Sequence, residues 1–170
     1  MADQRRRLIL FARFPVAGKV KTRLIPALGE EGAAALHRRL VLRTLRTANA
    51  LYQSQNVELE IRFAGDNASE MQHWFGDGWL CRPQCEGDLG QRMAGAFEDS
   101  FREGSPATVI IGSDCPTLKP DVLAAAFDSL KKNPVVFGPA TDGGYYLIGL
   151  ERGGNVYRLL QRRDDDGNAA

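Results

Sequence analysis

The sequence predicts an α/β protein with an open, mostly parallel sheet that carries helices on both faces. Short apolar runs alternate along the chain with segments of helical spacing, which is the pattern of parallel strands joined by crossover helices. The chain has 170 residues, the usual size of one domain. Hydrophobic residues make up 44% and charged residues 25%, which is the balance of a globular protein.

The first part of the chain supplies two strands and a long helix. Leu8–Ala12 is an apolar run typical of a buried parallel strand. Glu30–Tyr52 is predicted to be a helix because its apolar side chains recur at helical spacing: Leu36, Leu40, Val41, Leu45, Ala48, Leu51 and Tyr52. Val57–Ala64 alternates, so one face of a strand carries Val57, Leu59, Ile61 and Phe63.

The later elements continue this alternation. Ala68–Phe75 is predicted to be a short helix and Trp79–Arg82 a brief strand. Asp88, an acid at the start of the segment, favours a helix over Asp88–Glu103. Pro120 near the first turn favours a helix over Lys119–Lys131. Three further strands are predicted from apolar runs, namely Val109–Gly112, Val135–Phe137 and Tyr145–Leu150.

Composition narrows the class of protein. Residues 1–155 are predicted to form a single domain, and the polar residues 156–170 a partly disordered tail. No apolar run approaches the ~20 residues that span a bilayer, and the N-terminus does not resemble a signal peptide. We therefore expect a cytoplasmic protein with no membrane partner. The odd number of cysteines, three, argues against a disulfide framework.

Positive charge is concentrated at the start of the chain. Residues 1–50 hold 11 lysines and arginines against three acids, whereas the other 120 residues hold 11 against 18. A basic first third suits phosphate binding. Four of its arginines are expected to be solvated charges on the long helix: Arg38, Arg39, Arg43 and Arg46. Aromatic and basic residues do not interleave, so nucleic acid is not expected as a partner.

Three polar segments follow predicted strands, at residues 13–23, 113–116 and 139–144. In open α/β sheets, ligands bind outside the carboxyl ends of the strands. Because all three segments lie at such ends, we expect them to form one site.

The first segment is a candidate phosphate site. Its cations are expected to neutralise a diphosphate; they are Arg13, Lys19, Lys21 and Arg23. Gly18 is expected to let the backbone approach the phosphates. The spacing is not that of a Walker loop, and the chain has no GxGxxG fingerprint. A basic loop that faces only solvent is the alternative. Its position directly after a buried strand favours phosphate binding.

Two aspartates are candidate catalytic residues. Asp114 follows a β-branched strand, where a carboxylate is well placed to bind Mg²⁺ or Mn²⁺. The alternative is that Asp114 only caps the next turn. Asp142 precedes two glycines and is a candidate second metal ligand or an acid that faces the acceptor. Its spacing alone favours an ordinary Asp-Gly turn.

Residues 87–93 join a loop to the start of a helix. Backbone N–H groups there suit a phosphate or the edge of a base, so Asp88, Gly90 and Arg92 are candidate nucleotide-binding residues. A helix start capped by Asp88 is a compatible alternative. His37 and His73 lie on predicted helices away from the strand ends, and we expect both to be structural.

Four motifs occur in the order found in a known family, over about residues 7–150. They are FARFPVAGKVKTRL (11–24), GDLGQRM (87–93), GSDCP (112–116) and ATDGGYYL (140–147). On these motifs the chain resembles the glycosyltransferase-A-like family of radical-SAM/selenodomain-associated transferase 1. The resemblance implies a nucleotide-diphospho-sugar transferase fold, related in layout to molybdenum-cofactor guanylyltransferase and phospholactate guanylyltransferase.

The resemblance also implies roles for residues. It assigns Arg13, Lys21 and Arg23 to the nucleotide phosphates and Asp114 to the metal, with the segment at Asp88 beside the nucleotide. Members of the family usually continue past the position of Leu150 with a helix, a strand and an acidic segment. The C-terminal part of the fold is therefore expected to be shortened.

Three functions follow as hypotheses. The first is metal-dependent glycosyl transfer from a nucleotide-sugar to a small-molecule acceptor, which the usual name of the family favours. The second is nucleotidyl transfer, in which a phosphorylated small molecule attacks the α-phosphate of an NTP and pyrophosphate leaves. The basic loop suits this second reaction, because a triphosphate carries more charge. The third is a non-catalytic nucleotide-binding protein.

Overall fold

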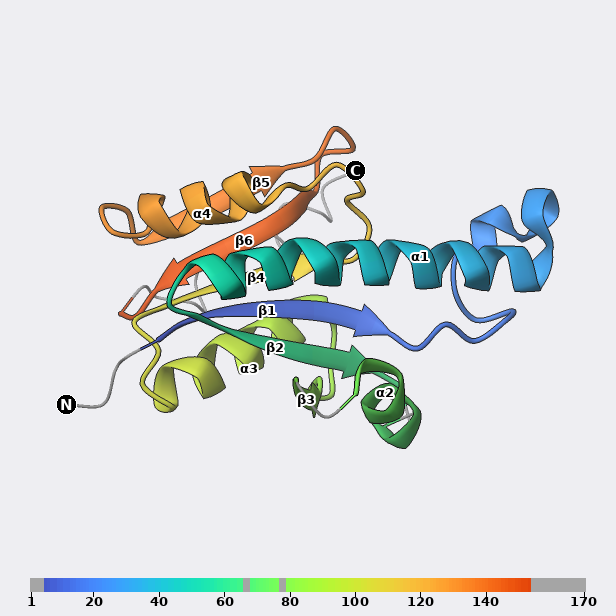
Figure 1. The fold of residues 1–170 in the computed structure, drawn as a ribbon, viewed down its shortest axis with the longest axis horizontal. Helices are drawn as coiled ribbons and strands as arrows, with labels where there is room; N and C mark the ends of the chain where they lie inside the picture. The colour runs from blue at the N-terminus through green and yellow to red at the C-terminus, as the bar shows by residue number, and fades with distance from the viewer. Residues whose placement is uncertain (1–4, 66–67, 77–78, 154–170) are drawn as a thin grey trace, which may run out of the picture.

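The computed structural model describes residues 5–65, 68–76 and 79–153 (Figure 1). The predicted tail, residues 156–170, lies outside these ranges. The strands are β1 Arg6–Arg13, β2 Val57–Ala64, β3 Leu80–Pro83, β4 Ala107–Gly112, β5 Val135–Pro139 and β6 Tyr145–Glu151. The helices are the 3-10 turn η1 Thr22–Leu24, α1 Ile25–Ser54, α2 Ala68–Phe75, α3 Leu89–Arg102 and α4 Pro120–Ser129.

The strands form one sheet in the order β3-β2-β1-β4-β6-β5. Strands β1 to β4 are parallel, and β6 runs antiparallel to both of its neighbours, β4 and β5. The predicted class, an open and mostly parallel sheet with helices on both faces, is therefore confirmed. The antiparallel direction of β6 follows from the tight turn over residues 140–144, because a short connection joins antiparallel strands only.

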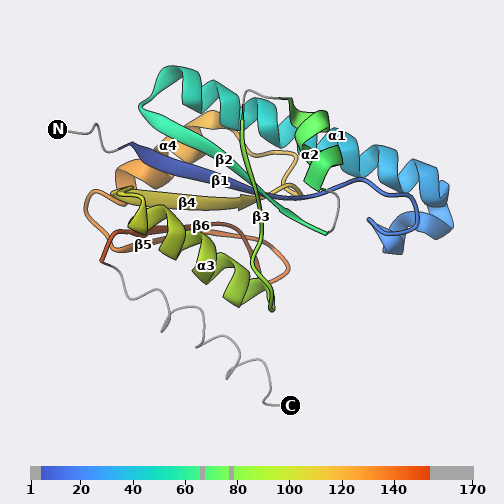
Figure 2. The same ribbon diagram turned by 90° about the horizontal axis from the view of Figure 1, so that it is seen from below.

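Helices cover the two faces unequally. One face packs against α1, α2 and α4, and its core includes Leu8, Leu10 and Ile61. The other face packs against α3, where Phe97 meets Ile9 and other alternate strand residues. Figure 2 shows α3 on the side of the sheet opposite α1 and α4. Because successive strand side chains point to opposite faces, continuous apolar runs supply both cores.

Helix α1 is interrupted near its start. Gly29 has a φ of 71° and a ψ of 169°, values that are not helical and that favour glycine. The long regular part of the helix thus follows Gly29, which agrees with the predicted start at Glu30. Its buried stripe is Ala33, Ala34, His37, Val41, Thr44, Ala48 and Leu51.

The face that α3 covers also contains a buried ionic network. Glu60 on β2 is fully buried, and its two carboxylate oxygens accept hydrogen bonds from Arg7 on β1 (3.2 Å) and Arg62 on β2 (2.6 Å). Arg62 also bonds to Asp99 of α3 (2.8 Å), and Arg7 to Glu103 just after α3 (2.5 Å). The network therefore ties the end of α3 to the centre of the sheet.

Candidate functional site

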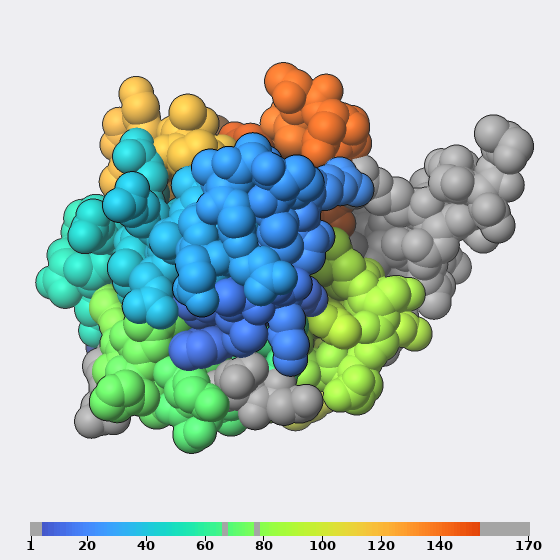
Figure 3. Space-filling model, turned by 90° about the vertical axis from the view of Figure 1, so that its right-hand side faces the viewer, coloured from blue at the N-terminus to red at the C-terminus, as the bar shows by residue number. Residues whose placement is uncertain are grey.

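The three polar segments lie together at the carboxyl ends of β1 and β4 and at the β5–β6 turn. They surround a cavity of about 1110 Å³ that the start of α3 also lines. Figure 3 views this end of the molecule, where the segment after β1 (blue) lies between the β5–β6 turn (orange) and α3 (yellow-green). Eight of the ten predicted site residues line the cavity: Arg13, Lys19, Lys21, Arg23, Asp88, Arg92, Asp114 and Asp142.

The cations of the cavity come mainly from the segment after β1. Arg13 ends this strand, and Arg13, Lys19 and Arg23 are exposed. Arg92 reaches the cavity from the first turns of α3, where its Nε donates to the carbonyl of Gly87 (2.7 Å). Side chains held at a strand end and a helix start can present positive charge to an anion from two directions.

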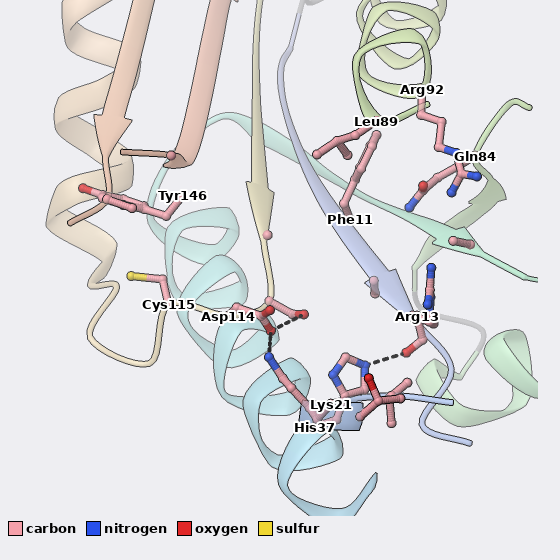
Figure 4. A pocket seen from close by; sticks show the side chains of 18 of the residues that line it. Phe11, Arg13, Lys21, His37, Gln84, Leu89, Arg92, Asp114, Cys115 and Tyr146 are labelled. Carbon is pink, nitrogen blue, oxygen red and sulfur yellow. Dashed lines mark hydrogen bonds and ion pairs between the residues drawn. The ribbon is translucent and has the colours of Figure 1, made fainter. Parts of the chain in front are cut away.

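Lys21 and Asp114 form an ion pair inside the cavity, with Lys21 Nζ 2.7 Å from Asp114 Oδ1 (Figure 4). The Asp114 side chain is 65% exposed and follows β4 by two residues. Ser113 is buried, so the strand end fixes the backbone while the Asp114 carboxylate faces the cavity. A carboxylate in this position can accept a cation.

Asp142 lies in the turn between β5 and β6. The amide of Gly144 donates to Asp142 Oδ1 (3.0 Å), and the amide of Ala140 donates to the carbonyl of Gly144 (2.9 Å). The structure thus contains the Asp-Gly turn that spacing alone favoured. Asp142 also lines the cavity, so the turn contributes a second carboxylate besides that of Asp114.

Asp88 caps α3. Its Oδ1 accepts from the amide of Gln91 (2.8 Å), and Gln91 Oε1 accepts from the amide of Asp88 (2.9 Å). This capping box was the structural alternative for Asp88, and it coexists with the position of Asp88 in the cavity lining.

Two predicted site residues, Gly18 and Gly90, are not among the lining residues. Gly18 has a φ of 76°, and a Cβ there would approach the Glu30 carboxylate at 3.4 Å, so the turn accounts for this glycine. Gly90 lies in the first turn of α3, where a Cβ would come 3.3 Å from Asp88 Oδ1.

His37 was expected to lie away from the strand ends, and this expectation was wrong. The ring belongs to the buried stripe of α1, lines the cavity, and its Nε2 lies 3.0 Å from the carbonyl oxygen of Arg13. That carbonyl requires a donor, so Nε2 carries the hydrogen. Burial lowers the pKa of His37, with smaller lowering by the charges of Lys21 and Arg13.

Three lining residues that were not among the predicted site residues form an apolar and amide side of the cavity. Phe11 and Leu89 line it beside Gln84, as Figure 4 shows. The Leu89 side chain is 61% exposed, so it is accessible to a ligand in the cavity. The Nε2 of Gln84 donates to the carbonyl of Arg62 (3.1 Å). These side chains offer a flat or apolar ligand group a surface distinct from the charged one.

Within residues 5–65, 68–76 and 79–153, no cluster of three or more histidine, cysteine, aspartate and glutamate side chains could hold a metal ion. In the same ranges, no helix combines the length and apolar character needed to cross a membrane.

Several solved structures resemble this chain. A proposed nucleotide-diphospho-sugar transferase from Desulfovibrio desulfuricans G20 is 28% identical and superposes with a TM-score of 0.81, over 94% of this chain and 75% of the other. The 4-diphosphocytidyl-2C-methyl-D-erythritol synthase of Anaerococcus prevotii is 9% identical, with a TM-score of 0.60 over 98% and 80% of the two chains. Rv0371c of Mycobacterium tuberculosis, solved in complex with manganese, is 19% identical, with a TM-score of 0.54 over 93% and 76%.

These likenesses establish the fold as that of the nucleotide-diphospho-sugar transferases and cytidylyltransferases. The sequence has no significant match among curated proteins. A family model does match residues 47–163, which is more than half of the chain. The chain therefore belongs to the bacterial family described as "Uncharacterized protein conserved in bacteria (DUF2064)".

Proposed function

We propose that this protein is a metal-dependent transferase that uses a nucleotide-activated donor and moves a glycosyl group from a nucleotide-diphospho-sugar to a small-molecule acceptor. One observation carries the proposal: a single cavity brings the cations after β1 together with Asp114 after β4. The four sequence motifs further support a place in the branch known as radical-SAM/selenodomain-associated transferase 1. The 28% identical protein of the same fold is consistent with this class of donor.

The cations are suited to the diphosphate of such a donor. Arg13, Lys19 and Arg23 are exposed at the cavity, so each can bond to a phosphate oxygen with little movement of the backbone. Phe11 and Leu89 offer an apolar surface for the uncharged part of the nucleotide. Asp142, which also lines the cavity, is the candidate base for the acceptor.

The residues present fit a divalent cation. Asp114 already attracts a cation, the ammonium of Lys21, and Asp142 supplies a second carboxylate to the same cavity. Mg²⁺ is commonly bound by one or two carboxylates together with substrate phosphates and water, so a larger protein cluster is not required. A bound Mg²⁺ or Mn²⁺ would stabilise the negative charge that develops on the leaving diphosphate.

In the proposed transfer, the acceptor hydroxyl oxygen forms a bond to the anomeric carbon of the sugar. The bond between that carbon and the diphosphate oxygen breaks, and its electron pair leaves with the nucleoside diphosphate. The hydroxyl proton passes to Asp142 or to solvent, while Arg13 and Arg23 stabilise the released charge.

Nucleotidyl transfer is the second candidate, and the number of cations favours it. Five cationic side chains line the cavity, enough to neutralise a triphosphate: Arg13, Lys19, Lys21, Arg23 and Arg92. In that reaction a phosphate oxygen of the acceptor would bond to the α-phosphorus, and pyrophosphate would leave. The carboxylate of Asp142 would repel a phosphorylated acceptor, which is why we place this candidate second.

One assay separates the candidates. The protein is incubated with nucleotide-sugars or NTPs and small hydroxyl or phosphorylated acceptors, with Mn²⁺ or with EDTA. We expect nucleoside diphosphate to be released from a nucleotide-sugar only with Mn²⁺. Release of pyrophosphate from an NTP would favour nucleotidyl transfer instead. Nucleotide binding without either product would indicate a non-catalytic binding protein.

We expect His37 to affect nucleotide affinity through the hydrogen bond that its Nε2 donates to the carbonyl of Arg13. Glutamine can place its amide near the position of Nε2 and still donate to that carbonyl, whereas asparagine is too short. Calorimetric titration of UDP and GTP should therefore give near-wild-type affinity for His37→Gln and about fivefold weaker affinity for His37→Asn, the effect of one net hydrogen bond. His73→Gln, at an exposed histidine of α2, is the control. Equal losses in both His37 variants would contradict this role.

A further inference from the structure

Lys21 has an unusual backbone conformation. Its φ is 50° and its ψ is 39°, the left-handed region, and it is the only residue other than glycine with a positive φ in the part of the chain that the structure describes. Side chains with a Cβ disfavour this region. Such outliers persist only where the surrounding structure holds them, and they are concentrated at functional sites.

The Lys21 side chain points to Asp114, as Figure 4 shows. Its ammonium lies 2.7 Å from Asp114 Oδ1, while the neighbouring exposed cation Lys19 lines the same cavity without an ion pair to Asp114. Only 21% of the Lys21 side chain is exposed, against 65% for Asp114. The more enclosed partner of the pair is thus the lysine, and it occupies one oxygen of the carboxylate.

We propose that Lys21 is a specificity-determining residue that makes the Asp114 site accept a divalent cation only together with a polyphosphate. This inference rests on the proposed function. A divalent cation bound to Oδ1 would lie beside the ammonium, and the two positive charges would repel each other. A nucleoside diphosphate resolves the conflict, because its oxygens bind the ammonium as well as the cation. The site therefore takes the metal–nucleotide complex as its ligand.

Binding of Mn²⁺ alone tests this directly, with free Mn²⁺ measured by electron paramagnetic resonance. Lys21→Ala and Lys21→Gly both remove the ammonium, and glycine also suits the left-handed backbone. Both variants are expected to bind Mn²⁺ about tenfold more tightly than wild type in the absence of nucleotide. Lys19→Ala changes the net charge equally and should bind Mn²⁺ as wild type does.

The same titrations with UDP or GDP present measure the coupling between the two ligands. In the wild type, nucleotide should tighten Mn²⁺ binding by about tenfold or more, within the usual range for coupled sites. In the Lys21 variants this factor should be clearly smaller, because Mn²⁺ no longer needs the nucleotide to draw the ammonium away, although the phosphate oxygens still serve as ligands.

Two different failures can be told apart. If the wild type binds nucleotide with Mn²⁺ but the Lys21 variants bind Mn²⁺ alone no more tightly, the role of Lys21 is overturned while the proposed function stands. An equal gain in Lys19→Ala would likewise overturn it, since net charge would then account for the effect. If the wild type binds no UDP or GDP under any condition, the proposed function fails, and the role of Lys21 with it.

Discussion

Asp114→Asn is expected to abolish the dependence of nucleotide binding on metal while leaving the fold intact. Asparagine keeps the shape of the side chain and removes its charge, so it cannot attract a divalent cation in the same way. In the wild type, Mn²⁺ should tighten UDP or GTP binding over EDTA by at least about tenfold, or about 1.4 kcal/mol. In the variant, calorimetric titration should give the same affinity with Mn²⁺ and with EDTA.

The direction of the change in EDTA adds a second check. Because Asp114 pairs with Lys21, its loss frees the ammonium for the phosphates, and metal-free binding should be unchanged or tighter. Thermal stability should stay near wild type, since an exposed ion pair contributes about 0–1 kcal/mol. If Asp114 only caps a turn, asparagine should substitute well and metal dependence should persist. That outcome would move the metal to Asp142.

The position of the site could be predicted because it follows from chain order. Each polar segment directly follows an apolar run, and parallel strands place their carboxyl ends at one edge of the sheet. The run Val109–Gly112 before Asp114 and the run Leu8–Ala12 before Arg13 were enough to bring these two residues together. The roles of these residues, metal binding by Asp114 and phosphate binding by Arg13, do not follow from chain order and stay predictions.

The buried ionic network could not be predicted, because it depends on partners from elements that are distant in the sequence. Glu60 and Arg62 lie on the polar side of an alternating strand, which the sequence alone gives no reason to bury. Their burial depends on Arg7 from β1 and Asp99 from α3. His37 is a different case, because a signal was present: it lies four residues after Ala33 and four before Val41, both in the buried stripe. The neighbouring arginines obscured that spacing.

Glu60→Gln is expected to cause a large loss of stability. Glu60 is fully buried and its carboxylate balances two guanidinium groups, Arg7 and Arg62, which are themselves almost fully buried. Removing one partner of a buried ion pair costs about 3–5 kcal/mol, and here both arginines lose their one fully buried counter-charge and keep only partners that are partly exposed. Urea denaturation should show this loss as a lower midpoint with an unchanged m-value.

Glu58→Gln is the matched control, because Glu58 lies two residues away on the same strand and also bonds to Arg7 (2.9 Å). Its side chain is 44% exposed, so its removal should cost at most about 1 kcal/mol. If Glu60→Gln loses no more stability than Glu58→Gln, the prediction is wrong, because water or rearranged side chains then compensate the buried charges. A double variant, Glu60→Met with Arg62→Met, should recover part of the loss, since it removes the buried charge of Arg62 together with that of Glu60 and leaves Arg7 paired with Glu58 and Glu103. Nucleotide affinity should be unchanged in every variant that stays folded, because the network lies outside the residues that line the cavity.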